Sequence, residues 1–171
     1  MRVAFTRRNT IATVFGVLVF ASKILIPTPF DKMAVAPQAL LLTLGFLLIG
    51  PLGATYVATV GGLLSAVWRA PFAPFTMAFA VVYGLLIDGF CHATKVRASD
   101  GSVKKARLVG AVTLSTAIVG LSSYYVTVFV FGVLPRNPLL EFIILIAGTL
   151  NGLIAGYLTL LVWSRITIYL G

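Results

Sequence analysis

The chain has 171 residues, of which 60% are hydrophobic and 10% charged, and its mean hydropathy is +1.07. This composition excludes an ordinary water-soluble domain. The net charge of +9 does not indicate nucleic-acid binding, because the basic residues flank apolar segments and no nucleic-acid module is recognisable. We therefore expect an all-α integral membrane protein that crosses the cell membrane several times.

Six apolar segments follow one another, separated where charges, prolines and glycines cluster. They predict one transmembrane domain over residues 1–171, with spans at 9–27, 35–49, 52–68, 72–91, 106–134 and 139–166. The first segment follows several arginines, as in a signal peptide, but its length and the lack of a convincing cleavage site favour a retained helix. Only Gly50 and Pro51 separate the second and third segments, so these two must form a tight hairpin.

The thirteen Lys and Arg residues predict the orientation of this six-helix bundle. With both termini in the cytoplasm, nine lie inside: Arg2, Arg7, Arg8, Lys95, Arg97, Lys104, Lys105, Arg107 and Arg165. Four lie outside: Lys23, Lys32, Arg69 and Arg136. The densest basic run, within 92–107, is explained by topology and anionic lipid headgroups, or else by a specific binding role.

Small residues recur at intervals of four along several predicted helices. In lipid, helices associate largely through close backbone approach, and small residues permit it. The third segment carries the longest strip, the sixth repeats it with Gly148, Gly152 and Gly156, and the first has only a pair. These strips either pack the helices of this chain together or bind a partner membrane protein. We predict a partner-docking role for Ala12, Gly16, Ala54, Ala58, Gly62 and Ala66.

Polar groups in a membrane are costly, so each one is a candidate for function. The outer half of the bundle is predicted to form an aromatic-rich pocket for a small ligand, to which Thr76 and Thr127 also belong. The candidate substrate-binding residues are Lys23, Lys32, Gln38, Trp68, Arg69, Tyr83, Tyr124, Tyr125, Glu141 and Asn151. Each has a structural alternative. The aromatic residues and the cations could lie at the membrane interface, Glu141 could complement a helix dipole, and Asn151 could form hydrogen bonds to another helix.

Catalytic chemistry has few possible participants in this chain. Asp88 and His92 are four residues apart, so they either form a proton relay or a solvated pair at a helix end. One cysteine and one histidine make no cluster for zinc or iron, and the sequence has no GxxxxGK[ST], GxSxG or HExxH motif. We expect no enzyme activity, no catalytic residue, no bound metal and no cofactor.

The stretch Leu47 to Ala54, "LLIGPLGA", continued by small residues to Gly62, resembles the second and third helices of a transporter subunit family. These are the substrate-capture S components of energy-coupling factor (ECF) transporters. The segment 24–30, "ILIPTPF", is similar to their first helix entering its outer loop, and 73–76, "APFT", to the start of their fourth. The length, the six spans and the orientation agree as well.

The resemblance implies a substrate-binding subunit for vitamin uptake, with a vitamin-like micronutrient bound under the loop between the first two spans. Its partners would be a transmembrane coupling (T) subunit and two cytoplasmic ATPases, which supply the energy. In that family small residues on the first helix contact the coupling protein, a pattern here reduced to Ala12 and Gly16. Two alternatives remain open: a membrane scaffold protein that binds no solute, and a small membrane enzyme acting on lipid.

Overall fold

The computed structural model describes residues 2–25, 35–68, 70, 73–98, 102–132 and 135–170. These residues form a bundle of six helices: α1 (Arg2–Leu25), α2 (Ala36–Ile49), α3 (Gly53–Trp68), α4 (Ala73–Ala93), α5 (Lys105–Phe129) and α6 (Pro138–Leu170). No strand is assigned in this part of the chain, only an isolated bridge between Arg97 and Val103. The all-α prediction is confirmed, and the expected segments agree with the helices to within a few residues, except where α1 begins earlier and α5 ends earlier.

Four helices are long and apolar enough to cross a membrane: α1, α4, α5 and α6. The 14 residues of α2 rise only about 21 Å and the 16 of α3 about 24 Å, against roughly 30 Å for a bilayer core. The fold is thus compatible with a membrane bundle. Four of the six expected spans are long enough to cross a membrane, whereas the two helices of the α2–α3 hairpin are too short to cross one unaided.

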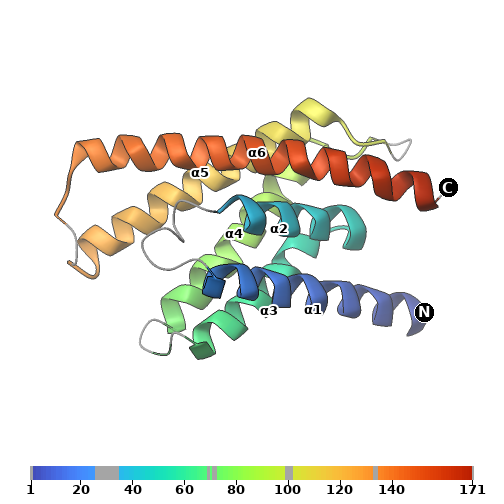
Figure 1. The fold of residues 1–171 in the computed structure, drawn as a ribbon, viewed down its shortest axis with the longest axis horizontal. Helices are drawn as coiled ribbons and strands as arrows, with labels where there is room; N and C mark the ends of the chain where they lie inside the picture. The colour runs from blue at the N-terminus through green and yellow to red at the C-terminus, as the bar shows by residue number, and fades with distance from the viewer. Residues whose placement is uncertain are drawn as a thin grey trace.

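Helix α2 lies at the centre of the bundle. It packs against each of the other five helices, and it lies between α1 and α6 in the view of Figure 1. Its residues are apolar on every side and mostly buried, as expected for a helix enclosed by protein. A helix in this position does not need to meet lipid, so it does not need the length of a membrane span.

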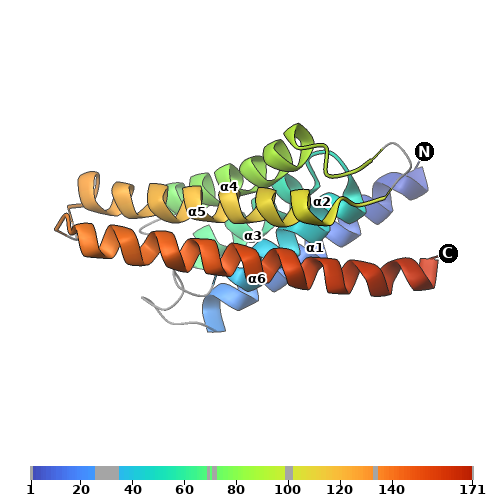
Figure 2. The same ribbon diagram turned by 90° about the horizontal axis from the view of Figure 1, so that it is seen from above.

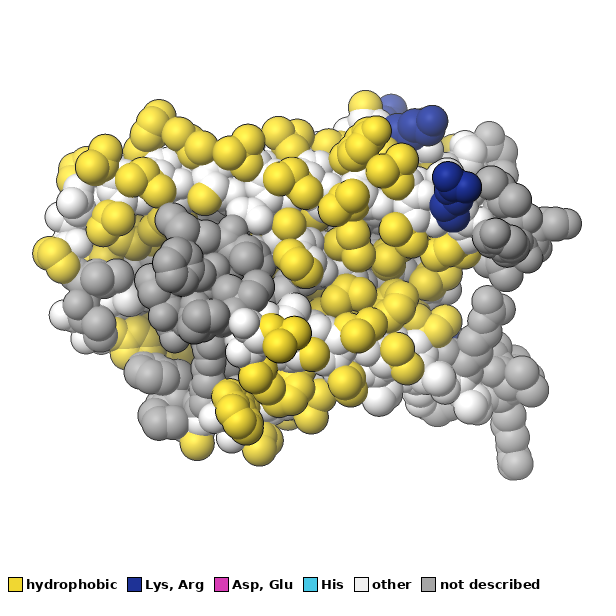
Figure 3. All heavy atoms as spheres, viewed as in Figure 1, with side chains coloured by type: hydrophobic (Ala, Val, Ile, Leu, Met, Phe, Trp, Pro, Cys, Tyr) yellow, Lys and Arg dark blue, Asp and Glu magenta, His cyan; other side chains and the backbone are white. Residues whose placement is uncertain are grey.

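The two ends of the bundle differ in charge. Both termini and the α4–α5 connection lie at one end, while the α5–α6 connection lies at the other (Figure 2). The described basic residues at the first end are all exposed: Arg8, Lys95, Arg97, Lys104, Lys105, Arg107 and Arg165. Between the ends, large exposed hydrophobic side chains cover the face seen in Figure 3. This distribution suits a protein whose sides contact lipid and whose basic end contacts an aqueous phase.

Glycines allow α5 and α6 to lie in backbone contact. A Cβ added to Gly152 would come within 2.5 Å of Thr113 Cα, and one added to Gly156 within 2.9 Å of Val109 Cα. A Cβ on Gly148 would lie 3.1 Å from Ala117 Cα. The strip expected on the sixth segment is therefore used within the chain, because it allows α6 to approach α5 closely.

We predict that Gly152→Ala destabilises the bundle, because the new methyl group meets the Thr113 backbone. The expected loss is about 1–3 kcal/mol in the free energy of unfolding, measured by thermal unfolding in detergent. Gly110→Ala is the matched control in α5, since a Cβ there meets nothing within 4 Å. It should be neutral or stabilise by up to about 1 kcal/mol. Equal effects of the two substitutions would contradict the packing described here.

Candidate functional site

A cavity of about 540 Å³ lies inside the bundle. All six helices contribute to its wall: the late part of α1, the first turns of α2, Ala58 and Ser65 of α3, the first half of α4, the second half of α5 and the first half of α6. Apart from those of α3, these segments belong to the end of the bundle opposite the termini. The cavity has the size of sites that hold small organic ligands.

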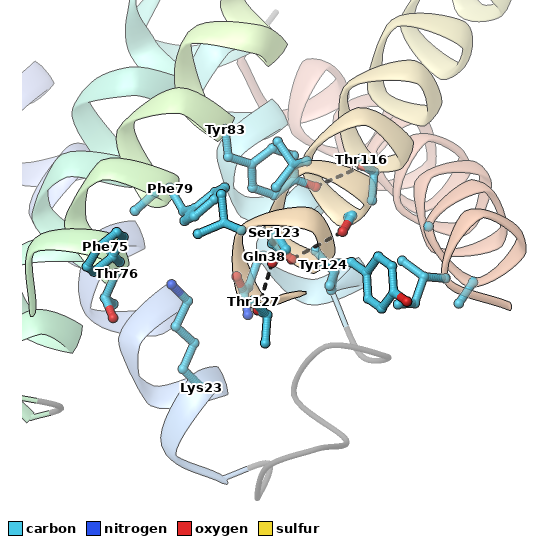
Figure 4. Close-up of a pocket in the computed structure, with 18 of the residues that line it drawn as sticks. Lys23, Gln38, Phe75, Thr76, Phe79, Tyr83, Thr116, Ser123, Tyr124 and Thr127 are labelled. Carbon is cyan, nitrogen blue, oxygen red and sulfur yellow. Dashed lines mark hydrogen bonds between the residues drawn. The ribbon is translucent and has the colours of Figure 1, made fainter. Parts of the chain in front are cut away.

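Aromatic rings form much of the wall. On α4, Phe75, Phe79 and Tyr83 are four residues apart and therefore share one face, which borders the cavity (Figure 4). Tyr124 of α5 and Phe131 after it complete the set. The rings of Phe75 and Phe131 meet edge to face, with centroids 4.5 Å apart, and so join the start of α4 to the end of α5.

A directed hydrogen-bond chain crosses the cavity wall from α4 to α5. Thr116 Oγ1 donates to the carbonyl of Val112 at 2.8 Å, which uses its only hydrogen. The hydroxyl of Tyr83, 2.8 Å from Thr116 Oγ1, must then be the donor between them. The Tyr83 oxygen keeps its lone pairs and can accept a hydrogen bond. Both residues are buried.

Gln38 differs from the other buried polar residues. In the part of the chain that the structure describes, six buried polar side chains make hydrogen bonds: Thr43, Ser65, Asp88, Ser115, Thr116 and Thr159. Gln38 is only 9% exposed and lines the cavity, yet its carboxamide makes no hydrogen bond to any described residue. A buried amide without a partner is costly, so such a group needs an explanation.

Lys23 brings a positive charge to the same cavity. Its side chain extends from α1 toward the space between Thr76 and Gln38 (Figure 4). Among the described residues that line the cavity, none is an aspartate or a glutamate. The wall is therefore mainly apolar, with one cation, one amide and several hydroxyl groups.

The structure brings four of the ten predicted ligand-binding residues together: Lys23, Gln38, Tyr83 and Tyr124 all line the cavity. Lys32 and Arg69 lie outside the described residues. Trp68 is 66% exposed at the end of α3, and Tyr125 stacks on Phe129 with ring centroids 6.0 Å apart. These last two do not line the cavity.

Glu141 and Asn151 also lie outside the cavity wall, and each has a structural role. Glu141 in the first turn of α6 forms an ion pair with Arg136 at 3.1 Å. Asn151 Oδ1 accepts from the backbone N–H of Ala36 at 3.2 Å, and its Nδ2 donates to the carbonyl of Ala147 at 2.7 Å. Asn151 thus caps the N-terminus of α2 from the middle of α6, the helix-to-helix alternative for this residue.

Asp88 caps α3 and does not bond to His92. Its Oδ1 accepts from the N–H of Ala54 at 3.1 Å, and its Oδ2 accepts from both the N–H and the hydroxyl of Thr55, at 2.8 and 2.6 Å. Asp88 is 5% exposed, whereas His92 is exposed. Neither a proton relay nor a solvated pair describes this carboxylate, which satisfies the free N–H groups of a helix end.

All six residues predicted to dock a partner are buried within the chain. A Cβ on Gly16 would lie 2.6 Å from Val60 Cβ of α3, and one on Gly62 would lie 2.7 Å from Ala80 Cβ of α4. Ala54 and Ala58 are 0% and 1% exposed, with Ala58 against Gly84 of α4. These strips pack α3 between α1 and α4, and this packing alone explains their small residues. Their role in docking a partner stays a prediction.

Phe75, Phe79, Thr116 and Ser123 are among the cavity residues that were not predicted. A signal for them exists in the sequence. Phe75, Phe79 and Tyr83 recur every four residues on α4, and Thr116, Ser123 and Thr127 recur at helical spacing on α5. Reading each predicted helix by its faces, and not residue by residue, would have found both stripes.

Comparisons of this chain with protein-family models, with curated proteins and with solved structures give no match.

We predict that Asp88→Ala lowers the free energy of unfolding by about 2–3 kcal/mol, because it leaves buried N–H groups of α3 without an acceptor. His92→Ala, one turn away and exposed, should change stability by less than about 0.5 kcal/mol. Chemical or thermal unfolding in detergent measures both. If the two residues acted as a pair, the two substitutions would have similar effects.

Proposed function

We propose that this chain is the substrate-capture subunit of an uptake transporter, binding a small vitamin-like solute in the cavity. The observation that carries the proposal is the cavity itself: about 540 Å³ lined by residues of all six helices, aromatic rings among them, with a buried carboxamide that no described residue satisfies. Pockets of this size and lining are typical of small-molecule sites. A bundle built only as a scaffold has no use for this space, since tightly packed interiors are more stable.

The charge distribution supports an outward-facing cavity. Basic residues favour the cytoplasmic side of a membrane protein, and the end with both termini and the α4–α5 connection is the more basic. With that end in the cytoplasm, the cavity faces the outside of a cell membrane, as capture of a solute requires. This orientation and the six-span topology are parts of the proposal.

Energy for uptake would come from other subunits. The sequence has no phosphate-binding motif for ATP, so we propose a transmembrane coupling subunit and two cytoplasmic ATPases as partners, as the resemblance to ECF S components implies. The buried small-residue strips are occupied by α1, α3 and α4. Replacing Ala58 or Gly62 would therefore disturb folding before it tested docking.

We predict that Thr76→Trp abolishes ligand retention, because Thr76 lines the cavity and an indole there would take up space that the ligand needs. Met77→Trp is the matched control, because Met77 follows Thr76 on α4, is exposed and does not line the cavity. The full chain is purified in mild detergent, and native mass spectrometry identifies small molecules that remain bound.

A small solute in the wild-type chain and in Met77→Trp, but not in Thr76→Trp, supports solute capture. No bound solute in any of the three, with only a membrane protein co-purifying, favours the scaffold alternative. Lipid that is chemically converted by the purified chain favours the enzyme alternative. Uptake of the identified solute by cells with and without the coupling subunit and ATPases then tests the transport step.

A further inference from the structure

Hydroxyl groups of the cavity wall donate their hydrogens within the protein. Thr116 donates to the carbonyl of Val112, and Tyr83 donates to Thr116. Other hydroxyl groups of the wall also donate to backbone carbonyls: those of Ser65, Ser123, Tyr124 and Thr127. Since a hydroxyl carries a single hydrogen, these groups have none left to donate to a ligand.

Two of these hydroxyl oxygens can accept a hydrogen bond from a ligand. In the part of the chain that the structure describes, no group donates to the hydroxyl oxygen of Tyr83 or of Ser123, and both residues line the cavity. A ligand donor placed against these oxygens gains a hydrogen bond. A ligand acceptor placed there meets oxygen lone pairs and stays unsatisfied in a mainly apolar space, which is costly. The wall formed by α4 and α5 therefore selects for N–H and O–H groups.

Gln38 on α2 requires both a donor and an acceptor. Its carboxamide is 9% exposed and makes no hydrogen bond to the described part of the chain. A carboxamide presents a carbonyl acceptor beside N–H donors, so a ligand edge with a donor next to an acceptor satisfies both. Amides, lactams and heterocycles with an amino group beside a ring nitrogen have such an edge.

The aromatic part of the wall favours a flat ligand. Phe79 and Tyr83 on α4 and Tyr124 on α5 line the cavity from neighbouring helices (Figure 4). Aromatic rings pack best against planar groups, by offset stacking or edge-to-face contact. Amino and hydroxyl substituents of a planar ring lie at its rim, so they can reach polar groups while the ring faces contact the aromatic side chains.

We infer that the solute is a flat heterocycle whose rim carries several hydrogen-bond donors: amino, N–H or hydroxyl groups donate to Tyr83 and Ser123, and a donor–acceptor edge pairs with Gln38. This inference rests on the function proposed above and adds the chemical class of the solute. Sites with buried hydrogen-bonding groups discriminate strongly against analogues that lack the counterpart. Tyr83 and Gln38 are therefore the residues that determine specificity.

Four purines that are uncharged near neutral pH test this donor requirement. Purine has only its ring N–H, adenine adds an amino group beside a ring nitrogen, and 2,6-diaminopurine adds a second amino group. In 6-methoxypurine an ether oxygen, which can only accept, replaces the amino group of adenine. Affinities are measured by titration calorimetry on the full chain in detergent. We expect affinity to rise about fivefold with each amino group, and to fall at least about tenfold from adenine to 6-methoxypurine.

Three substitutions assign the contacts. Gln38→Met removes the carboxamide and is expected to reduce the preference for adenine over purine about fivefold. Thr116→Val releases the hydrogen of Tyr83, which can then donate to a ligand, so the preference for adenine over 6-methoxypurine should fall about tenfold. Ser115→Ala is the matched control on α5 and should leave all preferences unchanged, because Ser115 is buried, donates to the carbonyl of Ala111 and does not line the cavity.

The melting temperature separates binding from folding. If the pair of Tyr83 and Thr116 were merely structural, Thr116→Val would lower the melting temperature and leave the probe preferences unchanged. That result, 6-methoxypurine binding to the wild-type chain as tightly as adenine, or no binding of any probe would overturn the inference. The wild-type comparisons test it even where a variant does not fold.

Native mass spectrometry distinguishes this inference from the proposed function. A retained solute that is a flat ring with several N–H or O–H groups supports both. If the retained solute is aliphatic or has no such donors, the inference fails while the proposed capture function stands. If the cavity retains only detergent or lipid, both fail.

Discussion

The structure depends on satisfying the backbone groups at the ends of two short helices inside an apolar bundle. Helix ends leave N–H and C=O groups without intrahelical partners, and lipid offers none. Asn151 of α6 caps the start of α2, Asp88 of α4 caps the start of α3, and the guanidinium of Arg97 donates to the carbonyl of Leu47 near the end of α2. Each cap comes from an element outside the hairpin, so these contacts hold the ends of α2 and α3 against α4, α6 and the α4–α5 connection.

The short central helix also explains why a cavity exists. The first turn of α2 is held beside the middle of α6 by Asn151, some 20 Å from the start of that helix at 1.5 Å per residue. The long helices continue beyond the start of α2. The cavity lies between these continuing parts, with Val35 and Gln38 of α2 at its wall. The caps that stabilise the fold therefore also set the position and depth of the candidate site.

Much of the fold could be predicted from the sequence, because apolar segments and their breaks at Gly50–Pro51 and Pro138 are local signals. The sequence also predicted that the second and third segments, 35–49 and 52–68, are short, but not why, and the structure gives them 14 and 16 helical residues. A segment as uniformly apolar as α2 is typical both of a lipid-exposed span and of an enclosed core helix. Only the arrangement of the other five helices around it decides between the two.

The candidate site was less predictable. The free-energy cost of placing a polar group in a membrane is the same whether that group has a structural or a functional role, so the cost does not separate the two. Asn151, Asp88 and Gln38 all satisfied the same criterion, a polar side chain in an apolar helix. What distinguishes them is whether a helix end lies within reach: Asn151 meets the start of α2, Asp88 meets the start of α3, and Gln38 faces the cavity. Such distances depend on how helices far apart in sequence pack, which residue spacing within one helix does not encode. A polar residue in a membrane bundle is therefore best assigned to function after the helix ends around it have been accounted for, and by that criterion Gln38 is the residue that a ligand must explain.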